Sequence, residues 1–260
     1  MEAETADEIP TGPEWQYEPK WDGFRCLAFR DGSEIELQSK SAQPLTRYFP
    51  ELVAWLAALP VDRFVLDGEI VIPVDGNLSF NDLLMRIHPA ESRVSKLARE
   101  HPSMLISFDL LVDLDRRLLV DEPLSERRPK LEQFAARAFG DGSVKLSPAT
   151  CDFEAASQWF RTMGGGLDGV IAKRLDVPYR AGERDGMLKI KNLRSADCVV
   201  GGFRYGSKGG QVGSLLLGLY DENGLLNHVG FSSSFRAEER PEITRKLESA
   251  RGGVGFTGKA

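Results

Sequence analysis

The amino-acid sequence predicts an α+β protein in which short strands, joined by tight turns, alternate with helices. The dipeptide Asp31-Gly32 is a hairpin signal, and residues 34–38 alternate between apolar and polar side chains, as a half-buried strand does. Residues 49–59 instead place apolar side chains at helical spacing and are followed by a proline, which ends a helix. A strand pattern and a helix pattern therefore both occur near the start of the chain.

The same patterns assign the elements that follow. We expect strands over 23–30, 34–38, 64–72, 104–112, 169–173 and 187–191, and helices over 49–59, 124–139 and 153–163, with a further helix capped by Ser79. Glycine-punctuated β segments follow at 198–205, 213–220 and 225–231, and then a helix at 237–250. We therefore divide the chain into a loose acidic tail at 1–14, a domain at 15–195 and a second unit at 196–260.

The composition is that of a soluble globular protein. Of 260 residues, 42% are hydrophobic and 28% are charged. No apolar run approaches the roughly 20 residues that span a bilayer, and the acidic start lacks the apolar core of a secretory signal. The three cysteines are widely spaced and form no metal-ligand cluster, which favours a reduced cytoplasmic protein.

Net charge does not decide the partner. The formal charge is −6, which by itself argues against a nucleic-acid binder. However, residues 1–18 carry six carboxylates and no Lys or Arg, so the rest of the chain is neutral overall. A neutral remainder can still present a basic face opposite an acidic one.

The segment 20–25 carries the first indication of chemistry. It reads KxDGxR, with Lys20 at its start and Arg25 at its end. A lysine amine is nucleophilic only when neutral, which requires burial or a nearby cation, and a fixed guanidinium supplies that cation and binds phosphate. A charged surface turn is the plain alternative. The pattern favours Lys20 as a nucleophile beside a phosphate-binding Arg25.

Four further motifs follow along the chain. Their central residues are Glu69, Phe108, Asp168 and the pair Lys189 and Lys191. Taken singly, each has a structural explanation: a solvated strand carboxylate, a core aromatic or a charged surface strand. The two lysines alternate on one expected strand, so both ammonium groups point to one face and favour an anion there.

In this order, the motifs resemble those of the covalent nucleotidyltransferases: KxDGxR, DGE, FD, DGVxAK and KxK. From about residue 15 to its end, the sequence is most similar to bacterial ATP-dependent DNA ligases of the ligase C group and to the ligase domain of ligase D. The stretches 18–25, 47–52, 200–203 and 213–218 carry this similarity. The resemblance implies a nucleotidyltransferase (adenylation) domain of antiparallel sheets flanked by helices, followed by part of an OB-fold β-barrel.

The resemblance implies catalytic roles for the basic residues. Lys20 would attack the α-phosphate of ATP, expel pyrophosphate and carry AMP as a lysyl phosphoramidate. Arg25 would contact the nucleotide or the nick phosphate. Lys189 and Lys191 would hold the α-phosphate, with help from Lys173. Positioned cations suit this reaction, because phosphoryl chemistry depends mainly on stabilising the developing charge.

The resemblance also implies residues that bind ATP and a metal. Phe108 would stack on adenine, whose edge the backbone near Glu18 would read. Glu69 would bind the ribose or, with Asp168, hold Mg²⁺ or Mn²⁺. The family usually has Glu where this chain has Asp168, and Arg where it has Lys40. Lys40 would keep the charge at the nucleotide but lose the bidentate geometry of Arg.

The implied substrate is nicked double-stranded DNA, bound mainly through its phosphates. AMP would pass to the 5′-phosphate, and the adjacent 3′-hydroxyl would displace it. The resemblance implies a monomer in the bacterial cytoplasm, associated with the nucleoid, that acts in DNA repair and recombination with other repair proteins. Family OB-folds end in a basic motif that orients pyrophosphate. The sequence stops at Ala260 without that motif, so we expect poor activation by ATP and continued reaction of preformed lysyl-AMP.

Two alternatives remain open from the sequence. An RNA ligase or capping-type guanylyltransferase would use the same motifs with another base or polynucleotide. A weakly catalytic module that binds DNA ends and recruits repair proteins would not need the charged motif residues, so their presence argues against it.

Overall fold

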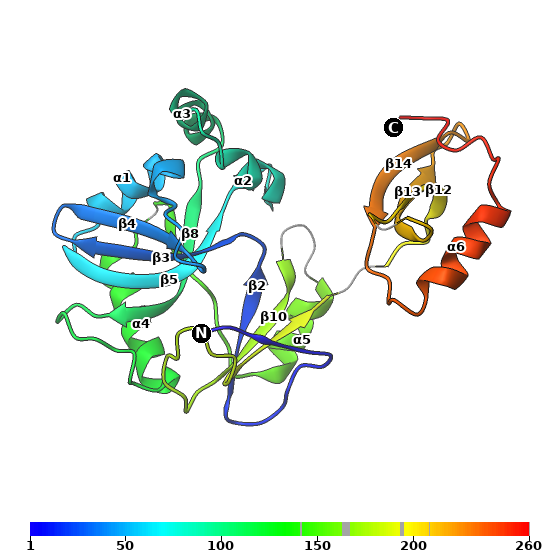
Figure 1. The fold of residues 1–260 in the computed structure, drawn as a ribbon. Helices are drawn as coiled ribbons and strands as arrows, with labels where there is room; N and C mark the ends of the chain where they lie inside the picture. The colour runs from blue at the N-terminus through cyan, green and yellow to red at the C-terminus, as the bar shows by residue number, and fades with distance from the viewer. Residues whose placement is uncertain (141, 163–166, 193–194, 208, 260) are drawn as a thin grey trace. The chain divides into compact units, whose positions relative to one another are not determined.

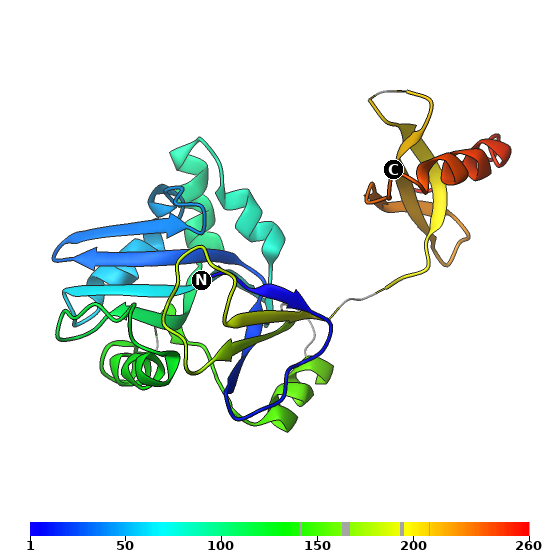
Figure 2. The same cartoon turned by 60° about the horizontal axis from the view of Figure 1, so that its bottom comes forward.

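The structure is a computed structural model of the chain and describes residues 1–140, 142–162, 167–192, 195–207 and 209–259. The chain forms two compact units, residues 1–193 and residues 194–260, called unit 1 and unit 2 below (Figures 1 and 2). The fold is of the predicted mixed α+β class, with predominantly antiparallel sheets. Among the described residues, no helix is both long enough and apolar enough to cross a membrane.

The larger sheet of unit 1 has five strands in the order β4-β3-β5-β8-β9. These strands are β3 (Phe24–Asp31), β4 (Glu34–Ser39), β5 (Arg63–Val71), β8 (Met104–Val112) and β9 (Val144–Leu146). Neighbouring strands are antiparallel except β8 and β9, which run parallel. The predicted hairpin at Asp31-Gly32 is confirmed, since it joins β3 to β4.

One face of this sheet forms the main hydrophobic core. Alternation along the strands points Ala28, Leu37 and Leu66 to that face, where each is fully buried. The helices α1 (Pro50–Ala58) and α4 (Leu124–Ala138) add Leu52 and Phe134 to the same core. The polar residues at alternate positions of β3 and β5 therefore face away from the core, toward the site described below.

The smaller sheet of unit 1 has the order β1-β11-β10-β2. Its strands are β1 (Glu4–Ala6), β2 (Trp15–Trp21), β10 (Leu167–Arg174) and β11 (Met187–Lys191). The helix α5 (Phe153–Thr162) packs on one face of β2 and β10, against Tyr17, Val170 and Ala172 (Figure 1). The other face of this sheet carries charged residues.

The expectation of a loose acidic tail over residues 1–14 was wrong for part of this segment. Residues Glu4–Ala6 form β1, which pairs in parallel with Leu188–Ile190 of β11. Backbone pairing accepts any side chain, so the acidic composition that suggested a solvated tail did not prevent a strand at this edge of the sheet. The carboxylate of Glu2 is also paired, with Lys40 at 3.1 Å and Arg184 at 3.3 Å.

Shorter elements connect strands of the larger sheet of unit 1. They are the 3-10 helix η1 (Thr46–Tyr48), the hairpin of β6 (Pro73–Val74) and β7 (Asn77–Leu78), and the helices α2 (Phe80–Arg86) and α3 (Glu91–Glu100). The predicted cap is confirmed, because the Ser79 hydroxyl accepts a hydrogen bond from the Asp82 amide at 3.2 Å. We did not predict α3, which buries only Val94 and Ala98.

Unit 2 contains a three-stranded antiparallel sheet and one helix. The strands β12 (Val199–Tyr205), β13 (Val212–Tyr220) and β14 (Leu226–Ser232) pair in chain order, and α6 (Arg240–Ser249) follows. The hydroxyl of Thr244 on α6 accepts a hydrogen bond from the Val212 amide at 2.9 Å. The sheet formed by the described residues is open, so a closed OB-fold barrel stays a prediction.

The buried ion pair of Glu51 and Arg86 contains none of the motif residues, and it gives a stability prediction. Both carboxylate oxygens of Glu51 accept hydrogen bonds at 2.7 Å from Arg86, which is fully buried, and one also accepts from Ser103. We expect Glu51→Ala to lower the free energy of unfolding by about 3–5 kcal/mol, because the Arg86 charge stays buried without a partner. Urea unfolding followed by circular dichroism measures this loss.

The matched control is Asp31→Ala, which removes the exposed ion pair with Arg63. Exposed pairs contribute about 0–1 kcal/mol, so this variant should unfold close to the wild type. Equal losses of unfolding free energy in the two variants would contradict the expectation that the buried pair contributes more to stability than the exposed pair.

Candidate active site

A cavity of about 250 Å³ lies in unit 1 and is lined by strands of both sheets. The predicted site residues that line it are Glu18, Lys20, Arg25, Lys40, Glu69, Phe108, Lys173 and Lys189. The lining also includes Trp21, Ile171 and Met187, which we did not predict as site residues. Residues that are up to 171 positions apart in the sequence, from Glu18 to Lys189, therefore converge on one cavity.

The register of β2, β10 and β11 explains why the basic residues share a wall. Lys20 lies opposite Gly169 on β10, and Gly169 lies opposite Lys191 on β11. The next row on the same face aligns Glu18 with Lys189 across the middle strand. Because side chains two residues apart on a strand share a face, each strand contributes its charged residues to one surface.

Two glycines permit the close backbone contacts around Lys20. Gly169 has a φ of +148°, and a Cβ atom there would lie 1.9 Å from the carbonyl oxygen of Ile190. A Cβ atom on Gly23 would lie 2.3 Å from the carbonyl oxygen of Ile70 on β5. Any other residue at either position would push neighbouring backbone away, so both glycines of the DG dipeptides are required by space.

Two β-bulges orient the side chains of Asp168 and Phe108. Between β10 and β2, Trp21 pairs with Leu167 and Lys20 pairs with Gly169, so Asp168 is an extra residue without a partner in the ladder. Between β5 and β8, Asp67 pairs with Asp109 and Gly68 pairs with Ser107, so Phe108 is extra in the same way. A bulge turns a side chain out of regular alternation, which explains how both side chains reach the site.

The predicted nucleophile Lys20 is held by an ion pair. Its ammonium donates to an Asp168 carboxylate oxygen at 2.7 Å, and both side chains are partly exposed. Asp22 lies nearby: burial, followed by the charge of Asp168, raises its pKa, while Lys20 and Lys191 oppose the rise. Since an amine attacks only after losing its proton, the pair with Asp168 must open before Lys20 reacts.

Glu69 lies among charges of both signs. Burial raises its pKa to about 8; the charges of Arg25 and Lys20 oppose this rise, whereas Asp67 and Asp22 add to it. Within the described part of the chain its side chain makes no hydrogen bond or ion pair. At neutral pH the carboxyl of Glu69 is therefore largely protonated and can act as a hydrogen-bond donor.

Arg25 is anchored by Asp67, a residue that we did not predict. The guanidinium donates to both carboxylate oxygens of Asp67, at 3.0 Å from Nε and 2.6 Å from Nη2. It also donates to the backbone carbonyl of Met1. Asp67 precedes Glu69 by two residues and so shares its face of β5, which is the pattern in the sequence that could have identified it.

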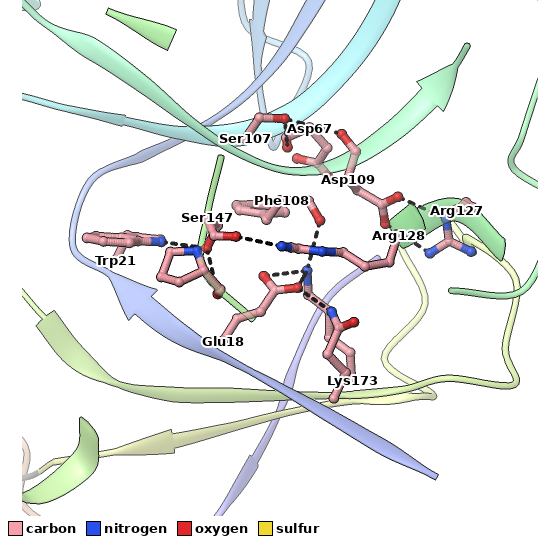
Figure 3. A network of polar contacts seen from close by, with 12 residues as sticks. Glu18, Trp21, Asp67, Ser107, Phe108, Asp109, Arg127, Arg128, Ser147 and Lys173 are labelled. Atoms are coloured by element: carbon pink, nitrogen blue, oxygen red, sulfur yellow. Dashed lines mark hydrogen bonds and ion pairs between the residues drawn. The ribbon is translucent and has the colours of Figure 1, made fainter. Parts of the chain in front are cut away.

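Phe108 lies against a buried ion pair (Figure 3). The ammonium of Lys173 is 4.5 Å from the centre of the Phe108 ring and 2.9 Å from the Glu18 carboxylate. Glu18 accepts a second hydrogen bond, from Gln16 at 2.8 Å. Lys173 is thus neutralised within the protein, and it fixes the aromatic ring through a cation–π contact.

The remaining predicted cations differ in their surroundings. Lys189 lines the cavity and forms no ion pair with any described residue. Lys40 also lines it but is paired with Glu2. Lys191 shares its face of β11 with Lys189 yet is exposed and outside the cavity lining, near Asp22. The structure therefore brings Lys189 to the cavity and leaves Lys191 beyond it.

The two predicted metal ligands do not form a complete metal site. Across the described ranges, no group of three or more His, Cys, Asp or Glu side chains is placed to hold a metal. Magnesium is usually bound by one or two protein carboxylates together with substrate phosphates. Asp168 fits such an incomplete donor set, and Glu69 would join it only after losing its proton; a nucleotide would supply the other oxygens.

Comparison with known proteins identifies the family. The family model described as the ATP dependent DNA ligase domain matches residues 2–191. The chain belongs to the ATP-dependent DNA ligase family. It is 48% identical to DNA ligase C2 of Mycolicibacterium smegmatis over 96% of this chain and 69% of that protein. It is 47% identical to DNA ligase C of Mycobacterium tuberculosis over 95% of this chain and 69% of that protein.

Solved structures agree with this assignment. The ligase domain of M. tuberculosis LigD is similar with a TM-score of 0.53 and 27% identity, over 99% of this chain and 82% of that one. A mycobacterial DNA ligase D complexed with ATP and MES is similar with a TM-score of 0.54 and 26% identity, over 99% of this chain and 81% of that one. The predicted resemblance to the ligase C group and ligase D is thereby confirmed.

The cavity lining of this ligase chain offers suitable contacts for the base and for the phosphates of a nucleotide. Phe108, Ile171 and Met187 provide apolar surface on which a base can stack. Lys20, Arg25, Lys40 and Lys189 provide positive charge for phosphates. ATP use follows from membership of the family, and this distribution of residues agrees with it.

The raised pKa of Glu69 gives a pH-dependence prediction. The folded state keeps the proton up to about pH 8, whereas the unfolded chain loses it near the ordinary glutamate pKa of 4.5. Without nucleotide or metal, stability should therefore fall as the pH rises between these values, by up to about 1.4 kcal/mol per pH unit from this group. Glu69→Gln should remove that part of the slope.

Unfolding free energies of both proteins between pH 5 and about 9 measure the difference. Glu36→Gln is the matched control, because Glu36 is exposed on the same sheet and its side chain bonds only Gln38 within the described part of the chain. Parallel pH profiles for the wild type and Glu69→Gln would show that Glu69 is ionised in the folded chain.

Proposed function

We propose that this ligase chain seals nicks in duplex DNA through a covalent lysyl-AMP intermediate on Lys20. The observation that carries the proposal is the position of Lys20, in a cavity that combines an aromatic wall with unpaired and paired cations. The curated relatives are named DNA ligases, and one similar structure contains ATP. Both findings support nucleotide transfer to a DNA end.

In the first step, the neutral amine of Lys20 attacks the α-phosphorus of ATP. A phosphorus–nitrogen bond forms, the bond from the α-phosphorus to the bridging oxygen breaks, and pyrophosphate leaves. Lys20 becomes neutral when its ammonium loses a proton to solvent, which reaches this partly exposed side chain, and the 2.7 Å ion pair with Asp168 then opens. Lys189 and Arg25 offset the charge on the phosphate oxygens.

A divalent cation, Mg²⁺ or Mn²⁺, would neutralise phosphate charge in this site. Asp168 and Glu69 are the residues that would hold it, together with phosphate oxygens. The Phe108 ring would position the adenine, and its own position depends on the Lys173–Glu18 pair beside it.

In the later steps, AMP passes from Lys20 to the 5′-phosphate at a nick, and the 3′-hydroxyl then displaces AMP and closes the strand. We expect a monomer that acts on nicked DNA in bacterial repair, at the nucleoid, with other repair proteins. An RNA ligase would prefer an RNA strand at the nick, and an end-binding module would bind nicks without sealing them.

The first prediction of this proposal concerns covalent AMP. Prolonged incubation with excess ATP and Mg²⁺ should raise the intact mass of at least a fraction of the wild-type chains by one AMP, and Lys20→Ala should abolish the gain because it removes the nucleophile. Lys96→Ala is the matched control, since Lys96 is exposed on α3 and, among the described residues, pairs only with Glu100. It should gain AMP as the wild type does.

A gain in Lys20→Ala would assign the nucleophile elsewhere. If the wild type gains nothing, a DNA nick that already carries 5′-AMP tests the last step without ATP. Sealing of that nick would support ligase chemistry, and failure of both reactions would contradict the proposal.

The second prediction concerns DNA affinity. Binding through phosphates releases counter-ions, so the affinity for a nicked duplex should fall at least about tenfold between 50 and 200 mM salt, as two or more phosphate contacts require. Fluorescence anisotropy with a labelled duplex measures the salt dependence. A matched duplex with RNA on one side of the nick separates DNA from RNA preference, and affinity independent of salt would contradict binding through phosphates.

A further inference from the structure

Tyr179 reaches the site from a segment that none of the motifs includes. It lies in the connection between β10 and β11, and its hydroxyl donates to Asp67 Oδ2 at 2.7 Å. The same hydroxyl oxygen accepts from Arg25 Nη2 at 3.4 Å. One hydroxyl group therefore touches both partners of the Arg25–Asp67 ion pair.

The hydroxyl completes the surroundings of a fully buried carboxylate. Asp67 has no exposed surface. Burial alone would raise its pKa, but the charge and hydrogen bonds of Arg25 and the hydrogen bond of Tyr179 hold the pKa below its ordinary value. Asp67 is thus a carboxylate that receives three hydrogen bonds, two from Arg25 and one from Tyr179. The third donor keeps Asp67 in place when the guanidinium shifts.

Tyr179 is itself held firmly by α4 and its neighbours. Its amide donates to the Val120 carbonyl at 2.8 Å. Its ring lies 5.7 Å from the guanidinium of Arg127, which pairs with both carboxylate oxygens of Asp109 at 2.9 Å. Arg127 also donates to the carbonyl of Val177, two residues before the tyrosine. The hydroxyl of Tyr179 therefore has a fixed position relative to β5 and β8.

Tyr179 acts as a donor throughout the working pH range. Burial raises the pKa of its hydroxyl, and the charge of Asp67 raises it further. The hydroxyl therefore keeps its proton, and its bond to Asp67 does not depend on pH near neutrality.

We propose that Tyr179 is a positioning residue for nucleotide transfer, acting through Asp67 to hold the Arg25 guanidinium against the nucleotide cavity. This inference rests on the proposed function, because Arg25 is one of the cations that would contact phosphate there. Loss of the hydroxyl leaves Asp67 with donors from Arg25 alone. The ion pair can then rotate as a unit and lose its alignment with the nucleotide.

Tyr179→Phe is the sharpest test, because it keeps the ring beside Arg127 and removes only the hydroxyl. We expect the rate constant of the step that depends on Arg25 to fall about tenfold. Arg25→Lys identifies that step: we measure its single-turnover rate constants for lysyl-AMP formation and for sealing at a nick that carries 5′-AMP. The step whose rate constant falls is the one that depends on Arg25. The matched control is Tyr205→Phe, which loses a hydroxyl bonded to Glu248 at 3.0 Å and should stay within about twofold of wild type.

The double variant Arg25→Lys with Tyr179→Phe separates positioning from general stability. If the tyrosine acts through Arg25, the double variant should be about as slow as Arg25→Lys alone. The inference would be overturned if the rate losses of the two single variants multiplied in the double variant. It would also be overturned if Tyr179→Phe slowed a different step from Arg25→Lys, or if its rate loss followed a fall in its melting temperature.

Equilibrium binding of ATP without divalent metal, measured by calorimetry, gives a readout independent of turnover. Tyr179→Phe and Arg25→Lys should weaken it by a similar factor, and unchanged binding and rates in Tyr179→Phe would overturn the inference.

The activity of the wild type separates a failure of the proposed ligase function from a failure of the role of Tyr179. A wild type that neither gains AMP nor seals a nick carrying 5′-AMP contradicts the proposed function itself. An active wild type matched by an equally active Tyr179→Phe contradicts only the role of the tyrosine.

Discussion

The buried pair of Arg25 and Asp67 is the interaction on which the site depends. A buried carboxylate is tolerated only when paired and hydrogen-bonded, and here three bonds from two side chains satisfy it. The pair joins β3 to β5 on the face away from the hydrophobic core, and Tyr179 ties it to the connection between β10 and β11. The Asp67 carboxylate is therefore a point where the larger sheet is linked to a segment of the smaller one.

The charges around the cavity are arranged to respond to a ligand. Lys20 is paired with Asp168, and Lys40 is paired with Glu2. Glu69 is protonated near neutral pH because burial raises its pKa. An arriving nucleotide with a cation supplies both signs of charge, so it can replace these internal partners without leaving a buried charge unpaired. Without substrate, Lys20 and Lys40 are thus paired within the protein, whereas Lys189 has no ion-pair partner among the described residues.

Several elements could be predicted because their causes are local. Ser79 caps α2, the Asp31-Gly32 turn joins β3 to β4, and the helix after Pro50 ends before the next proline. By contrast, β1 has an acidic sequence without a strand pattern. The apolar residues Val94, Leu97 and Ala98 of α3 do follow helical spacing, so this local signal was available and we did not use it. The bulges at Phe108 and Asp168 also escaped prediction, because a bulge is defined by the register of a partner strand.

The sequence by itself determined the family, the order of the motifs and most of the strands that carry them, because each motif is a short run whose spacing is visible along the chain. The strand β2, which carries Lys20, was not predicted. It also predicted that Lys189 and Lys191 share a face. Only the tertiary structure decided that Lys189 lines the cavity while Lys191 lies outside it. Likewise, Asp67 and Tyr179 meet at 2.7 Å although 112 residues separate them, and a contact at that separation depends on how the sheets pack.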